Sequence, residues 1–454
     1  MTERLPRANA AATLATLGVA LYGLMSDNLL VALGIPYNIP AGPLVAKLHP
    51  GTWVIGASFL WLVTGGNPLR NLTVLAKRTP AVAVLAVAAL AALIDTIALY
   101  GSSGSAFVID TFLAPCMLAF VLREAESLLA RRVFVLLVVI MAANAVLGLG
   151  EAITQRHLIP YMAGDVPIIE DHFRATALGG HPLANAKRTA EMMCAIFVLR
   201  PVGWIAMLVP LFGLALLAFG SRAALVATLG VLLAWALART IRGMVTRGGG
   251  GGHGLIVLLG LAALPVAAWS LDLGKRISDN FYWDTSAQSR LLVFKVFDHL
   301  DTYDLWVGIG AGSITEILDR LKGSTTLTDL ENFWILLLLQ FGLIFFVPLA
   351  VGLLATVYSL ARAGGIPTRL AAVVFLVLAS SNNSLATKTQ ALALALPMLI
   401  GSAAMGRKRE DEAPVMVTQT SAEPVRHAGT LFRLPSQDAA TAKRHTLFRL
   451  PPGA

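Results

Sequence analysis

Long runs of apolar residues dominate this sequence and limit the structures that it can form. Of its 454 residues, 56% are hydrophobic and only 13% are charged, whereas an ordinary soluble domain carries about 25% charged residues. The runs are long enough to cross a bilayer and too continuous for the strands of a barrel. We therefore expect an all-α, polytopic integral membrane protein. A soluble enzyme, a disordered chain and a secreted disulfide scaffold are excluded.

The apolar runs predict about twelve transmembrane helices, the first of them uncleaved. They lie near residues 9–26, 51–66, 80–100, 106–122, 133–150, 186–199, 202–219, 223–238, 254–270, 333–358, 370–385 and 389–405. The apolar segment 27–50 is interrupted by three prolines, so we predict a loop at the membrane surface there. Cys116 and Cys194 both fall in apolar runs and are interpreted as small buried residues.

Basic residues occur in alternate loops, which places those loops and both termini on the cytoplasmic side. The residues concerned are Arg4, Arg7, Arg70, Lys77, Arg78, Arg123, Arg131, Arg132, Arg200, Arg239, Arg242, Arg247, Arg362 and Arg369, with further ones in the tail. The net charge of +9 is therefore attributed to membrane orientation and to contact with anionic lipid rather than nucleic acid.

Residues 1–405 are predicted to form the transmembrane domain, with two long outer loops at about 151–185 and 271–332. The polar segment 406–454 is predicted to be a disordered cytoplasmic tail. It contains the hexapeptide TLFRLP twice, starting at Thr430 and at Thr446. The repeat is either a docking motif used twice or a duplication without function.

Three arginines on the predicted outer face are candidates for binding a lipid-linked diphosphate. Arg174 lies in the first outer loop, Arg222 opens the eighth span, and Arg290 lies in the second outer loop. A guanidinium group can pair with two oxygens of a diphosphate at once. The alternative is that these long side chains extend to the membrane interface without binding a substrate.

Carboxylates near the tenth span are candidates for a general base. Asp329 and Glu331 precede that span, followed by Asn332. One of them could cap the helix, or the group could form a base site. Asp95 and Asp110 lie within the third and fourth spans, and hydrogen-bonded structural roles are favoured over pairing with an outer arginine.

Residues suited to a metal or a nucleotide were not found in the sequence. His181 stands between Gly180 and Pro182 and is interpreted first as a turn residue. No His, Cys or Asp spacing suits zinc, so no metal is expected. The glycines of the segment 307–313, VGIGAGS, are interpreted as a turn before an amphipathic helix of about residues 313–322. No cofactor is expected.

These motifs, in this order, resemble those of the O-antigen ligase and polymerase superfamily of bacterial glycan assembly, over roughly residues 130–345. The matching elements are Arg174 with His181-Pro182-Leu183-Ala184-Asn185, Ser221-Arg222, Arg290, Gly308 to Gly312, Glu331-Asn332, and Phe341-Gly342-Leu343-Ile344. The family usually has histidine before the asparagine, and here Glu331 takes its place.

The resemblance implies a membrane-embedded glycosyltransferase fold of the GT-C type and an inverting, metal-independent reaction. The donor would be a glycan on undecaprenyl diphosphate, held by Arg174, Arg222 and Arg290. Glu331 would deprotonate the acceptor hydroxyl, with Asp329 as the rival base. His181 and Asn332 would support the site.

The leading functional hypothesis is polymerisation of lipid-linked repeat units into exopolysaccharide or O-antigen at the periplasmic face of the bacterial inner membrane. A ligase that transfers glycan to lipid A core or another acceptor is the first alternative. A transporter or flippase is the second, and the gathering of charges at the outer face disfavours it. Expected partners are the glycan donor, a glycan or lipid acceptor, membrane lipids and a chain-length regulator, but no nucleic acid.

Overall fold

A computed structural model describes most of residues 1–411. The described residues are 4–37, 43–102, 104–163, 166–168, 173–199, 202–246, 260, 293–310, 313–314, 316–318, 330–383 and 385–411. The expected span at 254–270 (except Gly260), Arg290, Asp329, Gly312 and the tail repeat lie outside them.

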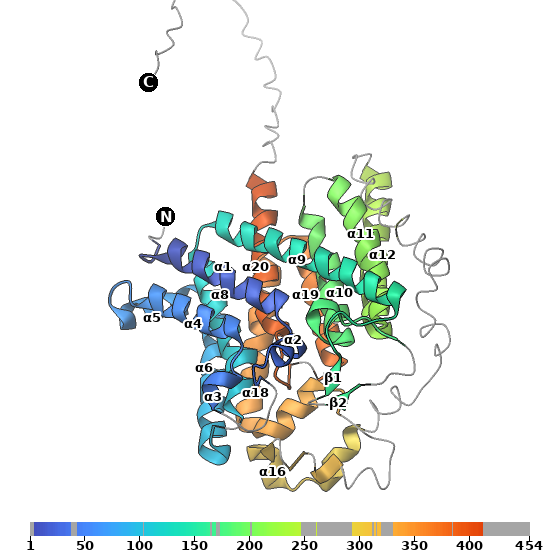
Figure 1. Cartoon of the computed structure of the whole chain (residues 1–454). Coiled ribbons are helices and arrows are strands. Elements are labelled where there is room, and N and C mark those ends of the chain that lie inside the picture. Colours follow the sequence, from blue (N-terminus) through green and yellow to red (C-terminus); the bar gives the residue numbers. More distant parts are fainter. Residues whose placement is uncertain are drawn as a thin grey trace, which may run out of the picture. The chain divides into compact units, whose positions relative to one another are not determined.

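Helices make up almost all of the regular structure that is described (Figure 1). The first half contains α1 (Ala8–Leu24), α2 (Asp27–Ala32), α3 (Leu44–Lys47), α4 (Pro50–Val63), α5 (Pro68–Arg78), α6 (Pro80–Tyr100), α7 (Ser105–Val108), the π-helical η1 (Ile109–Leu113), α8 (Ala114–Glu124) and α9 (Ser127–Thr154). A short antiparallel pair, β1 (Met162–Ala163) and β2 (Val166–Pro167), follows. The second half contains η2 (Ala177–Gly179), α10 (Pro182–Ala195), η3 (Ile196–Val198), α11 (Val202–Phe219), α12 (Arg222–Thr246), η4 (Val293–His299), α16 (Thr302–Val307), α18 (Phe333–Ala363), α19 (Ile366–Ser380) and α20 (Ala391–Asp411).

Six helical segments among the described residues are long and apolar enough to cross a membrane. They are 80–99, 105–124, 127–154, 202–219, 222–243 and 333–363, and each matches one of the twelve expected spans. Four more expected spans correspond to the shorter apolar helices α1, α4, α19 and α20. The expected span 186–199 falls on α10 and η3, and α10 carries three charged residues, Lys187, Arg188 and Glu191.

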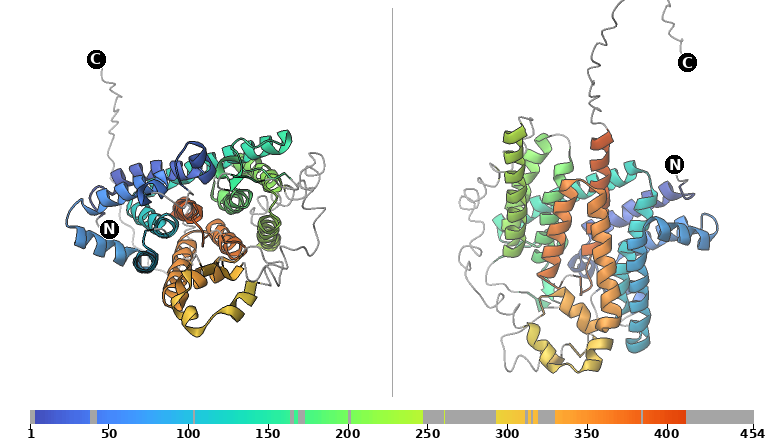
Figure 2. Two further views of the ribbon diagram at one scale, coloured as in Figure 1. Left: turned by 60° about the horizontal axis from the view of Figure 1, so that its bottom comes forward. Right: turned by 180° about the vertical axis from the view of Figure 1, so that it is seen from behind.

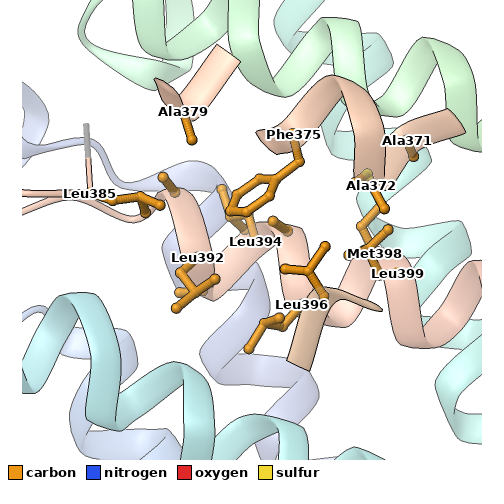
Figure 3. Packing of buried hydrophobic residues seen from close by; sticks show 14 of the residues in the cluster. Ala371, Ala372, Phe375, Ala379, Leu385, Leu392, Leu394, Leu396, Met398 and Leu399 are labelled. Atoms are coloured by element: carbon orange, nitrogen blue, oxygen red, sulfur yellow. The ribbon is translucent and has the colours of Figure 1, made fainter. Parts of the chain in front are cut away.

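The helix α20 lies among α8, α9, α10, α18 and α19 (Figure 2). Small and branched apolar side chains fill the contact between α19 and α20. In Figure 3, the ring of Phe375 of α19 points toward α20, near Leu394. Alanines such as Ala371 and Ala372 allow close approach of the helices, as is usual for packing inside membranes.

The segment before α4 contains more structure than the loop that the sequence predicted. Tyr37, Lys47 and His49 are all buried, at 2%, 8% and 0% exposure. The prolines prevent a long helix, but the side chains find polar partners inside the protein. Tyr37 and His49 both donate hydrogen bonds to Asp110 of η1, from the hydroxyl and the backbone N–H respectively. The segment therefore folds inward as two short helices, α2 and α3.

Polar contacts at one end of the bundle join segments predicted to lie outside. Asn28 donates to the carbonyl of Gly180, at 2.7 Å. Ala175 N donates to Ala218 O at the end of α11, at 3.1 Å. Lys388, in the connection between α19 and α20, donates to the carbonyls of Tyr37 and Lys47. These bonds bring four predicted outer connections into contact.

A second set of polar contacts joins segments predicted to lie in the cytoplasm. Arg78 pairs with Glu124 across the ends of α5 and α8. Arg4 pairs with Glu126, whose backbone N–H also bonds to the side chain of Asn9, the second residue of α1. Arg131 Nε donates to Ala404 O of α20, at 3.0 Å.

Candidate functional site

The described residues place several charged side chains from distant segments around the first turns of α10. We define the outer polar cluster as Asp27, Arg174, His181, Arg188 and Gln390. His181 interacts electrostatically with Arg174, Asp27 and Arg188. Arg188 donates to Gln390 Oε1 at 3.1 Å. Of these five residues, the sequence singled out only Arg174 and His181.

The loop that carries Arg174 is held in place by Glu151 of α9. One oxygen of this buried carboxylate accepts from Thr176 N and Ala177 N, at 2.7 and 2.9 Å. The other accepts from Leu158 N, at 2.6 Å. A carboxylate bound to three backbone N–H groups fixes the loop and offsets the cost of its own burial. The loop is thus a rigid support for Arg174.

A pair of asparagines fixes the junction between this loop and α10. Asn144 of α9 accepts from Leu178 N at 2.9 Å and donates to Asn185 at 3.1 Å. Asn185 in turn donates to Thr176 O. Asn185 is therefore a structural residue of the expected motif, and its amide ties the first turn of α10 to Thr176 and to Asn144.

His181 begins α10 as its N-cap. Its Nδ1 accepts a hydrogen bond from Leu183 N, at 3.2 Å, which confirms the interpretation of a turn residue. The ring lies edge-on to Tyr161, with centroids 5.8 Å apart. Because Nδ1 is engaged by the backbone, the other ring nitrogen is the one that can address a ligand.

Arg222 is the first residue of α12 and follows a tight turn. Gly220 has a φ of 66°, and Ser221 Oγ accepts from Ala224 N. The bond from Ala175 N to Ala218 O holds this turn beside the Arg174 loop. The structure therefore brings two of the three expected arginines to neighbouring positions, and Arg290 lies outside the described residues.

Glu331 and Asn332 precede α18, and they differ in what they contact. Asn332 Oδ1 accepts from Trp334 N and Ile335 N, at 3.0 and 3.3 Å, so it is the N-cap of the helix. Phe333 N donates to Asn382 O in the connection before α20. Glu331 is partly exposed, and Asp329 lies outside the described residues.

Asp110 is a hydrogen-bonded structural carboxylate, as the sequence analysis favoured. It accepts from Thr52 Oγ1 at 2.6 Å, Tyr37 Oη at 3.0 Å and His49 N at 3.1 Å. The same structural role was predicted for Asp95, on α6. Asp95 makes no hydrogen bond or ion pair among the described residues.

His49 is held as a neutral imidazole. Its Nδ1 accepts from Gly51 N at 3.0 Å, so its Nε2 carries the proton and donates to Met25 O at 2.9 Å. The ring stacks on Tyr22, with centroids 4.3 Å apart. Burial lowers the pKa of His49 to about 4, because the charged form loses its hydration there.

Lys388 joins the connection between α19 and α20 to the segment between α1 and α4. Its Nζ donates to the carbonyls of Tyr37 and Lys47 and lies 3.3 Å from the centroid of the Tyr37 ring. Burial lowers the pKa of Lys388 to about 8, and the nearby Asp110 carboxylate opposes that shift. The cation is thus bound to backbone oxygens and an aromatic face.

The sequence analysis missed the charged residues inside α10. Lys187 and Glu191 are buried, at 3% exposure each, and the Lys187 ammonium lies 4.7 Å from the Phe375 ring centroid. A signal was present, because NAKRTAE places three charges in one turn of an expected span. His181, Asn185 and Arg188 also have the spacing of one helix face.

The arrangement can bind an anion at the predicted outer end of the bundle. It offers two guanidinium groups, Arg174 and Arg188, that both act electrostatically on the imidazole of His181, with Arg222 on the adjoining turn. Among the described residues, no group of three or more His, Cys, Asp or Glu side chains could hold a metal ion. No family model matches this chain, and no curated protein matches it significantly.

Proposed function

We propose that this protein polymerises undecaprenyl-diphosphate-linked repeat units into exopolysaccharide or O-antigen at the periplasmic face of a bacterial inner membrane. The observation that carries the proposal is the placement of Arg174 beside His181 and beside the turn that carries Arg222. A diphosphate leaving group needs converging cations, and guanidinium groups supply both charge and paired donors.

A twelve-span topology with both termini in the cytoplasm is part of the proposal. It is supported by the polar contacts at the two ends of the bundle. The contacts of Asn28, Ala175 and Lys388 join segments that this topology places outside. The contacts of Arg78 and Arg131 join segments that it places inside.

The proposed reaction is a single displacement. The acceptor hydroxyl gives its proton to the Glu331 carboxylate, and its oxygen forms a bond to the anomeric carbon. The bond from that carbon to the diphosphate oxygen breaks, and the electron pair leaves with undecaprenyl diphosphate. Arg174, Arg222 and Arg290 stabilise the charge of the leaving group. The resemblance to the ligase and polymerase superfamily supports these roles.

A flippase is the second candidate, and a specific observation favours it. The charges of Lys187 and Glu191 lie buried within α10, and α18 is interrupted at Gly342, where φ is 61°. Transporters often combine buried charges with broken helices. The gathering of charges at the outer face therefore disfavours a flippase less than the sequence suggested. A ligase remains an alternative on the resemblance alone.

Deletion of the gene, followed by analysis of lipid-linked glycans, separates these functions. We expect single repeat units on the carrier lipid in the outer leaflet. Long polymer retained on the carrier would instead indicate a ligase, and single units trapped in the inner leaflet would indicate a flippase. Either of these two results would contradict the polymerase proposal.

The arginine roles are tested by Arg222→Ala, with Arg156→Ala as the matched control. Arg156 is an exposed arginine at the end of the α9 segment, on the same predicted side. We expect Arg222→Ala to reduce polymer by at least about a hundredfold, the size reported for loss of one transition-state donor. Full polymer at normal protein level would exclude a role for Arg222.

A further inference from the structure

Arg188 lies on the same face of α10 as His181 but two turns further into the bundle. Arg188 is partly buried, and its guanidinium donates a hydrogen bond to the side-chain oxygen of Gln390. Gln390 is itself buried at 4% exposure, and its amide donates to Met25 O at 2.7 Å. Gln390 is therefore itself held in place, and its amide oxygen positions the guanidinium of Arg188.

The Nε of Arg188 is buried and has no hydrogen-bond partner among the described residues. A buried guanidinium donor without an acceptor is costly, because the N–H loses its water and gains nothing in return. Such a donor is expected where a ligand supplies the missing acceptor.

Two carboxylates and a tyrosine act on Arg188. Asp27 of α2 and Glu191 of α10 act on it electrostatically, and the Tyr37 hydroxyl lies within the same range. His181 is acted on by both Arg188 and Arg174. Both guanidinium groups therefore act on one imidazole at the first turns of α10, and Asp27 acts on both the imidazole and Arg188.

We propose that Arg188, positioned by Gln390, is a further donor-binding residue that takes a phosphate oxygen of the lipid-linked diphosphate opposite Arg174. This inference rests on the proposed function, because it names the ligand of the same site. A diphosphate presents oxygens on two phosphorus atoms and can pair with two guanidinium groups at once, whereas a monophosphate has oxygens on only one. Arg188 therefore makes the site selective for diphosphate over monophosphate.

The test uses the purified full chain in detergent, with farnesyl diphosphate and farnesyl monophosphate as probes and calorimetry as the measurement. We expect the wild-type protein to bind the diphosphate more tightly than the monophosphate. Arg188→Ala should weaken diphosphate binding by at least about tenfold, as for loss of a charged hydrogen bond. Its effect on monophosphate binding should be much smaller, so the selectivity falls.

Arg156→Ala is the matched control, because it removes an exposed arginine on the same predicted side, and its binding should equal that of the wild type. If Arg188→Ala does not fold, the selectivity is measured with Arg188→Lys instead. Lysine keeps a positive charge near Asp27 but lacks the paired N–H donors of the guanidinium group. A folded Arg188 variant with wild-type selectivity would overturn this inference and leave the proposed function standing. A wild-type protein that does not prefer diphosphate would overturn both.

Discussion

Gly308 and Gly342 lie with their backbones in direct contact. A Cβ atom added to Gly342 would lie 2.5 Å from Gly308 N, and one added to Gly308 would lie 2.6 Å from Gly342 N. Both have positive φ angles, 88° and 61°, with ψ near 160–175°, a region open almost only to glycine. The end of α16 therefore packs into the break in α18, and Ile309 N bonds to Leu339 O there.

Gly342→Ala should destabilise the protein strongly, because the backbone strain costs about 1–3 kcal/mol and the new Cβ would collide with α16. Thermal unfolding of the purified protein in detergent measures this. The control is Gly150→Ala in α9, where an added Cβ meets nothing within 4 Å. That change should be neutral or slightly stabilising. An unchanged melting temperature for Gly342→Ala would contradict the packing described.

Stability should fall as the pH drops from 6.5 toward 4, because of His49. Below pH 6.5 the unfolded chain binds a proton on this histidine, whereas the folded protein, with a pKa of about 4, does not. The unfolded state is then favoured, by about 2 kcal/mol at pH 5. Melting temperatures measured from pH 7.5 to 4.5 test this. His49→Gln should flatten the profile, and an unaltered profile in that variant would assign the effect elsewhere.

Glu331 and Asn332 should respond differently to substitution, although they are neighbours. Glu331→Gln should abolish polymer formation with little change in stability, since the variant cannot accept the acceptor's proton. Asn332→Ala should lower stability by about 1 kcal/mol, the usual effect of losing an N-cap. Asn332→Asp should retain the cap. Polymer formation and melting temperature are measured for all three. Retained polymer in Glu331→Gln would favour Asp329 as the base.

The proposed orientation predicts that cysteines introduced at two exposed arginine positions are labelled from opposite sides of the membrane. Arg70 of α5 and Arg156 after α9 are both exposed, and the two native cysteines are buried and should give little background. A membrane-impermeant maleimide applied to intact spheroplasts should label Arg156→Cys. It should label Arg70→Cys only after lysis. Labelling of Arg70→Cys in intact spheroplasts would rule out this topology.

The long apolar helices could be predicted from the sequence because hydrophobic length is a local property. The run at 80–100 matches α6 residue for residue, and 202–219 matches α11. The structural role of Asp110 was also predicted, because a carboxylate inside an apolar run is favoured when it finds hydrogen-bond donors. The same prediction for Asp95 finds no such donor among the described residues. These inferences needed no knowledge of which helices are neighbours.

The outer polar cluster could not be predicted in the same way. Arg188 became a candidate binding residue only through its interactions with Gln390, 202 residues later in the chain, and with Asp27, far earlier. Nothing in the sequence relates these three positions. The inward fold of Tyr37 and His49 was missed for the same reason, because Asp110 lies more than sixty residues away from each.

The bond from Lys388 to Tyr37 spans 351 residues, and this has a consequence for the order in which the protein is made. When only the first four helices have been synthesised, Lys388 and Gln390 are still absent. The backbone carbonyls of Tyr37 and Met25 then lack the side-chain donors that bind them in the complete protein. These contacts form only once the connection before α20 has left the ribosome. Synthesis of residues 388–390 is therefore the step that completes the outer polar cluster, and every shorter nascent chain lacks it.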